Sequence, residues 1–425
     1  MSFDGVQDNG RQFLDLGGKR RTKWWHGLSS ATIFATGMLA KGFASLMLKD
    51  VEVSNLDILQ EAQERCRIEK RGLITIMNHM SLLDDPFVWA ILPTKNFTSP
   101  DQIRWSLGAD NVLFFNEFLA SFFSLGQVLS TKRFGEGPFQ GSIDASIALL
   151  SGYNTQQLQD PRTNLPQKYW IKRGAEASDL QASFKTNWVH IFPEGFVHQV
   201  YPPHRYTLRY FHWGASRLLL EATKPPIIVP IYAYGFDNVI PEDKQDDYSL
   251  WGQRNKATLR VKVGQPIDDG QVASFRQRWA DLVEEEEEKK RINGGAKKIV
   301  DVSSSSSLTD KNVIPLRHGN MPEELKTGTR AQKLRSEVAL FLRSALDSVR
   351  ESMGLPREKL DFGNPAFWDP ETGGCKDVPV MGDVNKLEVH KLKDFFHLLE
   401  DEVTPPSVTG GSAVRGTAGS VSSCK

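Results

Sequence analysis

Short apolar runs alternate with helical stretches in the middle third of this 425-residue chain, a pattern typical of an α/β domain. Four apolar runs are candidate strands: residues 73–77, 188–192, 227–233 and 259–263. All but the last are followed closely by polar residues or by Gly and Pro, and α/β proteins place their chemistry at strand ends. The pattern therefore predicts a central β-sheet flanked by helices, with a site where the strands end.

An apolar stretch near the start, residues 27–48, contains one charge, Lys41. Its length just matches the roughly 20 residues that cross a bilayer, but Ser and Thr dilute its apolar character. We expect a membrane-associated helix lying partly in the interface, with Trp24 and Trp25 at headgroup depth. A full span and a helix packed on the catalytic domain are the alternatives. Three Asp residues in the first fifteen positions argue against a transit peptide, so any organelle signal would be internal.

Composition changes sharply after Val283, where five consecutive Glu residues are followed by basic residues and a serine run at 303–307. Such a segment buries too little apolar surface to offset the entropy of ordering. Helical periodicity resumes at 330–350, and a Gly, Ser and Thr-rich tail ends the chain. The predicted units are a membrane-proximal segment 1–50, an α/β domain 51–283, a disordered insertion 284–328, a C-terminal helical region 329–404 and a disordered tail 405–425.

The overall composition excludes some classes of function. The 52 Lys and Arg residues balance the 52 Asp and Glu residues, so no global positive field would attract nucleic acid. Cys66, Cys375 and Cys424 lie far apart and form no metal-binding spacing, so we interpret them as free thiols. The sequence predicts neither a metal site nor a cofactor.

The first candidate for chemistry is the pair His79 and Asp84, which follows the run 73–77. On a continuous helix, residues five apart point about 140° away from each other and cannot touch. The dipeptide Asp85-Pro86 is a good helix start, with Asp as N-cap and Pro at the first helical position. The turn 78–84 is therefore expected to fold Asp84 back onto His79.

A His–Asp contact of this kind suits general-base catalysis. The carboxylate fixes the tautomer of His79 through one ring nitrogen and leaves the other to accept a proton from a substrate hydroxyl. Ser81 lies nearby, but the sequence has no GxSxG elbow, so a serine acyl-enzyme is not expected. A single HxxxxD is common by chance, and a turn histidine satisfied by its own loop remains an alternative. A metal site at His79, Asp84 and Asp85 would lack further ligands.

Two further clusters extend the candidate site. Glu194 and Gly195 close the second strand, where a carboxylate and open backbone N–H groups could face a substrate. We expect N–H groups near Gly195 or in the turn 78–81 to stabilise an oxyanion. Lys132 and Arg133 precede a glycine-bearing loop and could bind a phosphate, although such a pair is usually solvated surface.

These residues, in this order and together with Pro230, resemble the four sequence blocks of the glycerolipid acyltransferase family, over roughly residues 20–280. The surrounding text, NHMSLLDDP, VHIFPEGFVHQ, LRYFHWGASRLLLEA and PIIVPIYAYGFDNVIP, is similar to the members that remodel mitochondrial cardiolipin. Those members transfer acyl chains from a phospholipid to a lysophospholipid without coenzyme A.

The resemblance implies a role for each matching residue. His79 would be the base and Asp84 its partner. Arg133 would bind phosphate, with Lys132 as the alternative because Phe134 makes the register uncertain. Glu194 and Gly195 would position the substrate, and Pro230 would shape the pocket. One departure is His212, which stands where this family is expected to have a lysine.

Residues 113–125 form a candidate membrane contact. At 100° per residue, six apolar side chains fall within one arc: Phe115, Phe118, Leu119, Phe122, Phe123 and Leu125. Periodicity alone allows either a membrane-inserted or a core helix, and the resemblance favours insertion. It also implies attachment to mitochondrial membranes facing the intermembrane space without a full span.

The expected function is therefore phospholipid–lysophospholipid transacylation, with cardiolipin and monolysocardiolipin as substrates, a membrane surface as partner and no nucleic acid. One rival is an acyl-CoA-dependent lysophospholipid or glycerol-phosphate acyltransferase built on the same blocks. The other is a non-catalytic lipid-binding protein, which the joint presence of His79 and Asp84 disfavours.

Overall fold

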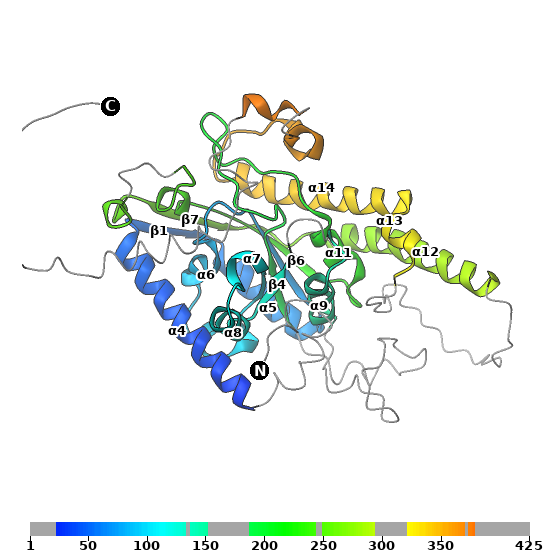
Figure 1. Ribbon diagram of the computed structural model, residues 1–425, viewed down its shortest axis with the longest axis horizontal. Coiled ribbons are helices and arrows are strands. Elements are labelled where there is room, and N and C mark those ends of the chain that lie inside the picture. Colours follow the sequence, from blue (N-terminus) through cyan, green and yellow to red (C-terminus); the bar gives the residue numbers. More distant parts are fainter. Residues whose placement is uncertain are drawn as a thin grey trace, which may run out of the picture.

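A seven-stranded sheet forms the centre of the molecule in a computed structural model, which describes residues 23–132, 137–151, 187–243, 249–293, 321–369 and 373–378 (Figure 1). The strand order is β1-β7-β6-β2-β5-β3-β4, and all neighbours are parallel except β6 and β7. The strands are β1 Asp50–Ser54, β2 Leu73–Met77, β3 Trp105–Ala109, β4 Val128–Thr131, β5 Trp188–Ile191, β6 Ile227–Tyr234 and β7 Thr258–Val263. The expected α/β class is confirmed.

Helices cover both faces of this sheet. The α-helices are α4 Lys23–Met47, α5 Leu56–Glu69, α6 Asp84–Phe87, α7 Asp110–Leu113, α8 Glu117–Leu125, α9 Gly141–Leu150, α11 Trp213–Glu221, α12 Asp269–Asn293, α13 Glu323–Thr327 and α14 Thr329–Glu351. The 3₁₀ turns are η1 Val88–Ile91, η2 Thr94–Thr98, η3 Pro100–Gln102, η5 Phe236–Asn238, η6 Trp251–Gln253, η7 Leu360–Gly363, η8 Pro365–Trp368 and η9 Gly374–Asp377.

The central strand β2 shows how the sheet divides the core in two. All five of its residues are buried, as expected of an interior parallel strand. Because side chains alternate along a strand, Leu73 and Met77 join the core on the side of α4 and α5. Ile74 and Ile76 join the core on the opposite side, with α9, α11, α12 and α14. Figure 1 shows α4 and α14 on opposite sides of the sheet.

Three strands were not predicted from the sequence: β1, β3 and β4. Strand β1 lies at the edge and is mostly exposed, so it lacks the apolar alternation that marks a strand. Strands β3 and β4 are short; β3 carries Ser and Gly and β4 ends in Ser and Thr, so the apolar signal is weak in both.

Helix α4 packs lengthwise on the catalytic domain. Its Ile33, Ala44 and Met47 are buried in the core, and Lys41 Nζ donates a hydrogen bond to the Ala90 carbonyl at 2.7 Å. This bond explains why a charge is tolerated in the middle of an otherwise apolar helix. No helix in the described ranges is long and apolar enough to cross a membrane. Of the predicted alternatives, the structure shows the packed helix, and membrane association stays a prediction.

Helix α8 exposes large apolar side chains and buries small ones, the opposite of an ordinary surface helix. Its small residues Ala120 and Ser124 are buried, whereas Phe118 is 78% exposed and Phe122 is 38% exposed. The helix begins later than predicted, because Asn116 caps it by accepting from Leu119 N at 2.8 Å. Phe118 and Phe122 are therefore not core, whereas Phe123 is half-buried and packs against Phe114, so the membrane contact of the arc stays a prediction.

The predicted insertion 284–328 is wrong at both ends. Helix α12 continues to Asn293 through the glutamate run, where Glu285 pairs with Arg330 of α14 and Glu286 pairs with Lys289. Residues 321–328 are ordered by Met321 and α13, which pack on the same core. Residues 294–320 and the insertion 154–185 lie outside the described residues.

The described residues between Glu351 and Val378 are less helical than predicted. Helix α14 ends at Glu351, and only 3₁₀ turns follow it in the described residues. Phe362 and Trp368 of these turns form a small core with Val200. The tail 405–425 also lies outside the described residues.

Candidate active site

His79 lies directly after β2, at the carboxyl end of the strand. Its Nδ1 lies 3.0 Å from Oδ2 of Asp84, so the two predicted residues do meet. The imidazole stacks on Phe192, with ring centroids 4.1 Å apart and planes 21° apart. None of the described residues forms a hydrogen bond with Nε2, and the side chain is 20% exposed. This arrangement holds the ring firmly and leaves one nitrogen for a substrate.

The turn 78–84 is closed by the Asp84 carboxylate itself. Its Oδ2 also accepts from the backbone N–H groups of Met80 at 2.6 Å and Ser81 at 2.9 Å. The Ser81 hydroxyl accepts from Leu83 N at 3.2 Å and is fully buried. One carboxylate therefore both closes the turn and orients the imidazole. The Ser81 hydroxyl stabilises the same turn and does not face the cavity as a nucleophile would.

Asp85 does not cap a helix as the sequence suggested. Its backbone is extended, with φ −120° and ψ 121°, and α6 is only one turn long. The carboxylate forms an ion pair with Arg104 and accepts from Trp89 Nε1 at 3.1 Å. Burial is the largest single influence on Asp85 and raises its pKa, but the charges of Arg104 and His190 and the hydrogen bonds to the carboxylate together outweigh it, so the net pKa is lowered. The local preference of Asp for the N-cap position is overridden here by the ion pair with Arg104, which is distant in the sequence.

Glu194 is 1% exposed and does not line the cavity. One carboxylate oxygen accepts from His79 N at 3.1 Å and the other from Arg209 N at 2.8 Å. Burial raises the pKa of Glu194 to about 8, although both hydrogen bonds act in the opposite direction. The geometry favours a positioning role for Glu194 rather than direct contact with the substrate.

Gly195 lines the cavity in a conformation that only glycine adopts readily. Its φ is +81°, and an added Cβ would lie 2.9 Å from Cδ2 of His212. His212 also lines the cavity, and burial and then the Arg209 charge lower its pKa. His212 is therefore neutral at pH 7 and cannot replace the charge of the expected lysine.

The predicted oxyanion donors are already engaged. The N–H groups of Met80 and Ser81 donate to Asp84, and that of His79 donates to Glu194. The Gly195 N–H donates to the Phe192 carbonyl at 3.1 Å, closing the tight turn that follows β5. These four groups build the scaffold, so an oxyanion donor elsewhere in the turn around Gly195 stays a prediction.

Of the two predicted phosphate contacts, only Lys132 lies in the described residues, and Arg133 does not. Lys132 follows β4 and lines the cavity. Its backbone is fixed by Gln140, whose amide accepts from Lys132 N and donates to Lys132 O, both at 2.9 Å.

Pro230 does not line the cavity. It is buried within β6, where its carbonyl accepts from Gly264 N at 2.8 Å. Its role in shaping the pocket, which the resemblance implied, can only be indirect.

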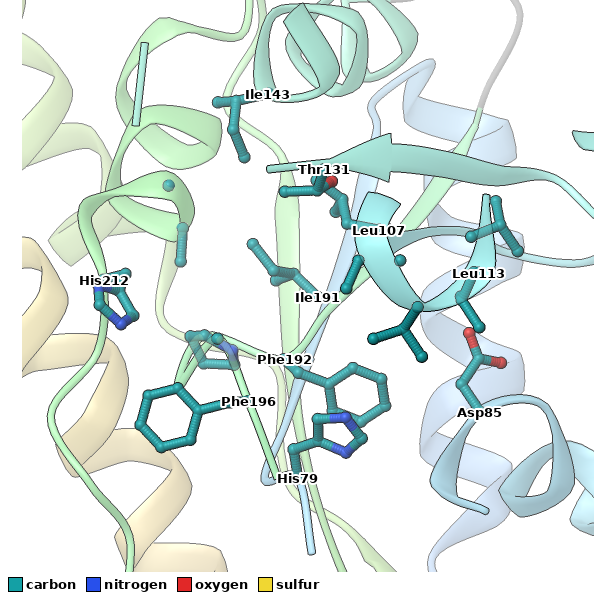
Figure 2. Close-up of a pocket in the computed structure, with 18 of the residues that line it drawn as sticks. His79, Asp85, Leu107, Leu113, Thr131, Ile143, Ile191, Phe192, Phe196 and His212 are labelled. Atoms are coloured by element: carbon teal, nitrogen blue, oxygen red, sulfur yellow. The ribbon is translucent and has the colours of Figure 1, made fainter. Parts of the chain in front are cut away.

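One cavity of about 660 Å³ joins these groups. Figure 2 shows His79 next to Phe192 and Phe196, with Thr131 and Ile143 farther away along the cavity. Most of the wall is apolar, and helices α4 and α8 contribute five of its residues: Ile33, Thr36, Gly37, Phe122 and Phe123. A deep apolar space that meets a histidine–carboxylate pair suits an acyl chain whose ester lies beside the base.

Sequence reasoning missed two features of the site. The Arg104–Asp85 ion pair joins residues on different elements, and no spacing rule connects them. Arg209 lines the cavity within the LRYFHWG segment, but nothing in its local sequence distinguishes it from other arginines.

Comparison with known proteins identifies the fold and its chemistry. A family model described as Acyltransferase matches residues 50–234, which contain His79, Asp84 and Glu194. Tafazzin of Saccharomyces cerevisiae is 41% identical over 402 residues, covering 90% of this chain and 94% of that protein.

Two more distant relatives match more than half of the chain. The protein Taffazin of Dictyostelium discoideum is 33% identical over 58% of this chain and 72% of its own. The N-acylphosphatidylethanolamine synthase of Arabidopsis thaliana is 28% identical over 56% of this chain and 70% of its own. The near full-length match at 41% identity is the stronger finding. With a His–Asp pair at the end of β2 and an apolar cavity beside it, the chain belongs to the tafazzin family of phospholipid acyltransferases.

Proposed function

We propose that this acyltransferase is a transacylase that moves an acyl chain from a phospholipid to the free hydroxyl of a lysophospholipid without coenzyme A. The observation that carries the proposal is the Asp84–His79 pair, which leaves Nε2 without a hydrogen bond from any described residue. His79 is the base and Asp84 orients it and stabilises its charge. The tafazzin relatives support lipid esters as both donor and product.

The reaction balances with a single histidine. Nε2 of His79 takes the proton of the acceptor hydroxyl while that oxygen attacks the carbonyl carbon of the donor ester. Collapse of the tetrahedral intermediate breaks the bond to the donor glycerol oxygen, which leaves with the proton from the imidazolium. An ester is lost and an ester is formed, so the step is near thermoneutral and reversible. It leaves His79 neutral and ready for the next turnover.

We propose that lipids enter from a membrane at the adjoining helices α4 and α8. Both helices line the cavity and both expose large apolar side chains. On α4, Trp24, Leu28, Leu39 and Leu46 fall on one side of the helix, at 84%, 56%, 63% and 40% exposure. On α8 the exposed apolar side chains are Phe118 and Phe122, and Phe115 precedes the helix. Leu119 and Phe123 belong to the same proposed contact. Apolar burial in the membrane interface would hold this surface without a full span.

We propose cardiolipin and monolysocardiolipin as the physiological lipids, at mitochondrial membranes facing the intermembrane space. The support is the tafazzin relatives and the sequence resemblance. Protease protection of tagged protein in intact and outer-membrane-ruptured mitochondria would test the location. Resistance to protease after rupture of the outer membrane would contradict it.

The reaction is tested by supplying purified protein with a labelled phospholipid donor and a lysophospholipid acceptor, without coenzyme A. Transfer of label to the acceptor supports transacylation. Transfer only after acyl-CoA is added would identify the CoA-dependent rival, and binding without transfer would identify the non-catalytic one. Mass spectrometry of the product also shows whether the acceptor atom is oxygen or the amine of an ethanolamine headgroup.

A further inference from the structure

Arg209 is the feature of the cavity that the proposed mechanism does not use. It lies in the loop between β5 and α11, and its side chain lines the cavity. The guanidinium carbon lies 4.5 Å from the ring centroid of Phe196, 5.1 Å from that of Tyr210 and 5.3 Å from that of Trp368. Figure 2 shows Phe196 and His79 at the same end of the cavity, and Glu194 bonds to the backbone N–H groups of both His79 and Arg209, which places this cation at the catalytic end.

The guanidinium of Arg209 forms no ion pair with a described residue, and its Nε is buried without a hydrogen-bond partner. The other cavity arginine, Arg104, is neutralised by Asp85. Buried arginines elsewhere also have partners: Arg217 pairs with Asp144 and Glu221. A guanidinium with no carboxylate paired to it can still donate to an incoming anion through its terminal NH₂ groups while it is held against aromatic rings.

The backbone of Arg209 is fixed on both sides. Its N–H donates to Glu194 Oε2 at 2.8 Å, and its carbonyl accepts from Arg343 Nε of α14 at 3.0 Å. The other oxygen of the same Glu194 carboxylate accepts from His79 N at 3.1 Å. One buried carboxylate therefore holds the base and Arg209 at a set spacing, as expected of two groups that contact the same substrate.

We infer that Arg209 binds the phosphodiester of the lipid whose glycerol reacts at His79, an inference that rests on the proposed function. In a glycerophospholipid the phosphate lies only a few bonds from the reacting oxygen, so a base and a guanidinium that line one cavity and share Glu194 as a backbone partner match the molecule. The planar guanidinium can donate two parallel hydrogen bonds to phosphate oxygens. Neutral His212 beside it leaves this charge to Arg209.

Binding tests the inference without relying on turnover. The probes are dihexanoyl phosphatidylglycerol below its micelle concentration and dihexanoylglycerol, which lacks the phosphate, with tryptophan fluorescence as readout. Arg209→Gln is expected to weaken binding of the phosphate-bearing probe by about 10- to 100-fold, the cost of a lost charged hydrogen bond. Binding of the phosphate-free probe should change by less than about threefold. Arg209→Lys keeps the charge but loses the planar pair of donors, so its affinity for the phosphate-bearing probe should lie between those of the wild type and Arg209→Gln.

Arg205→Gln is the matched control. Arg205 lies in the same loop but pairs with Asp237 and does not line the cavity, so its replacement should weaken neither probe selectively. Equal weakening of both probes by Arg209→Gln would mean a structural role and overturn the inference, as would no weakening of either. Inorganic phosphate binding more tightly than the lipid probe would also overturn it, by assigning the cation to free phosphate.

The same variants separate this inference from the proposed function. Acyl exchange measured over a range of acceptor concentrations should show a higher KM in Arg209→Gln and a nearly unchanged kcat. Wild-type protein that prefers the phosphate-bearing probe but transfers no acyl group would refute the transacylase and leave the binding site standing. Transfer that is unaffected by Arg209→Gln would refute the binding site and leave the transacylase standing.

Discussion

Replacing Asp84 by Asn tests the catalytic pair with little change in shape. In the wild type, Oδ2 accepts from His79 Nδ1 at 3.0 Å, Met80 N at 2.6 Å and Ser81 N at 2.9 Å. If the amide NH₂ of the Asp84→Asn side chain occupied the position of Oδ2, it would face two backbone donors. The amide oxygen must therefore occupy that position. The oxygen then still accepts from Nδ1–H of His79, and the tautomer is preserved. Only the negative charge is removed.

The magnitude follows from that geometry. Hydrogen bonds to charged groups contribute about 1.5–3 kcal/mol and neutral ones about 1 kcal/mol. The two backbone bonds are the same before and during the reaction, so their weakening should lower stability by about 2 kcal/mol without changing the barrier. The bond to His79 matters more when the ring becomes positively charged, and its weakening should cost about 10- to 100-fold in kcat. In the serine-protease triad the same change costs about 10⁴-fold because the tautomer is wrong.

The assay is CoA-independent acyl exchange under saturating lipid, with vesicle co-sedimentation to confirm that lipid binding is retained. Asp57→Asn, on the exposed face of α5, is the charge-matched control and should behave as wild type. Activity of Asp84→Asn within about threefold of wild type would show that Asp84 does not orient the base. A loss near 10⁴-fold would show that the backbone amides do not fix the tautomer. Either result refutes the reasoning.

Three further changes have defined outcomes. His79→Ala should lower kcat by about 10²- to 10⁴-fold with an unchanged melting temperature, and wild-type turnover would exclude it as the base. Phe118→Glu should keep the melting temperature of the detergent-purified protein, because this side chain is 78% exposed, but should abolish co-sedimentation with vesicles. A large fall in melting temperature would contradict the membrane contact. His198→Phe should raise stability by about 1–3 kcal/mol, since both ring nitrogens are buried without hydrogen-bond partners among the described residues. Burial lowers the pKa of His198 from 6.5 to about 3, so its contribution is full above pH 6.5 and lost as pH falls toward 3. The melting advantage of the variant should therefore grow over that range, and a constant advantage would refute the assignment.

Much of the site could be predicted because its signals are local. The buried run of β2 is apolar at every position but Thr75, and the HxxxxD pair immediately follows it. Chain geometry alone required a turn that brings Asp84 onto His79. The functional class could be predicted for the same reason, since ordered blocks are read directly from the sequence.

The missed features depend on tertiary structure. A helical wheel of α8 shows an aromatic arc but not that Ala120 and Ser124 face inward. The extended conformation of Asp85 follows from Arg104, a partner on another element. Arg209 is one of 52 Lys and Arg residues, and it is distinguished by lining the cavity without a paired carboxylate, which no linear pattern contains.

Helix α14 holds the loop between β5 and α11, so the catalytic domain cannot be separated from the C-terminal region without loss of structure. Arg343 donates to the carbonyls of Leu208 and Arg209, and Arg350 donates to that of Tyr206. Three carbonyls of this loop therefore depend on a helix beyond the matched segment 50–234. A premature stop before α14 would also remove Leu342 and Leu346 and so expose the core against which they pack. A gene product truncated there should be cleared or aggregate rather than persist as a weak catalyst, because losing the last long helix removes part of the fold and part of the active site together.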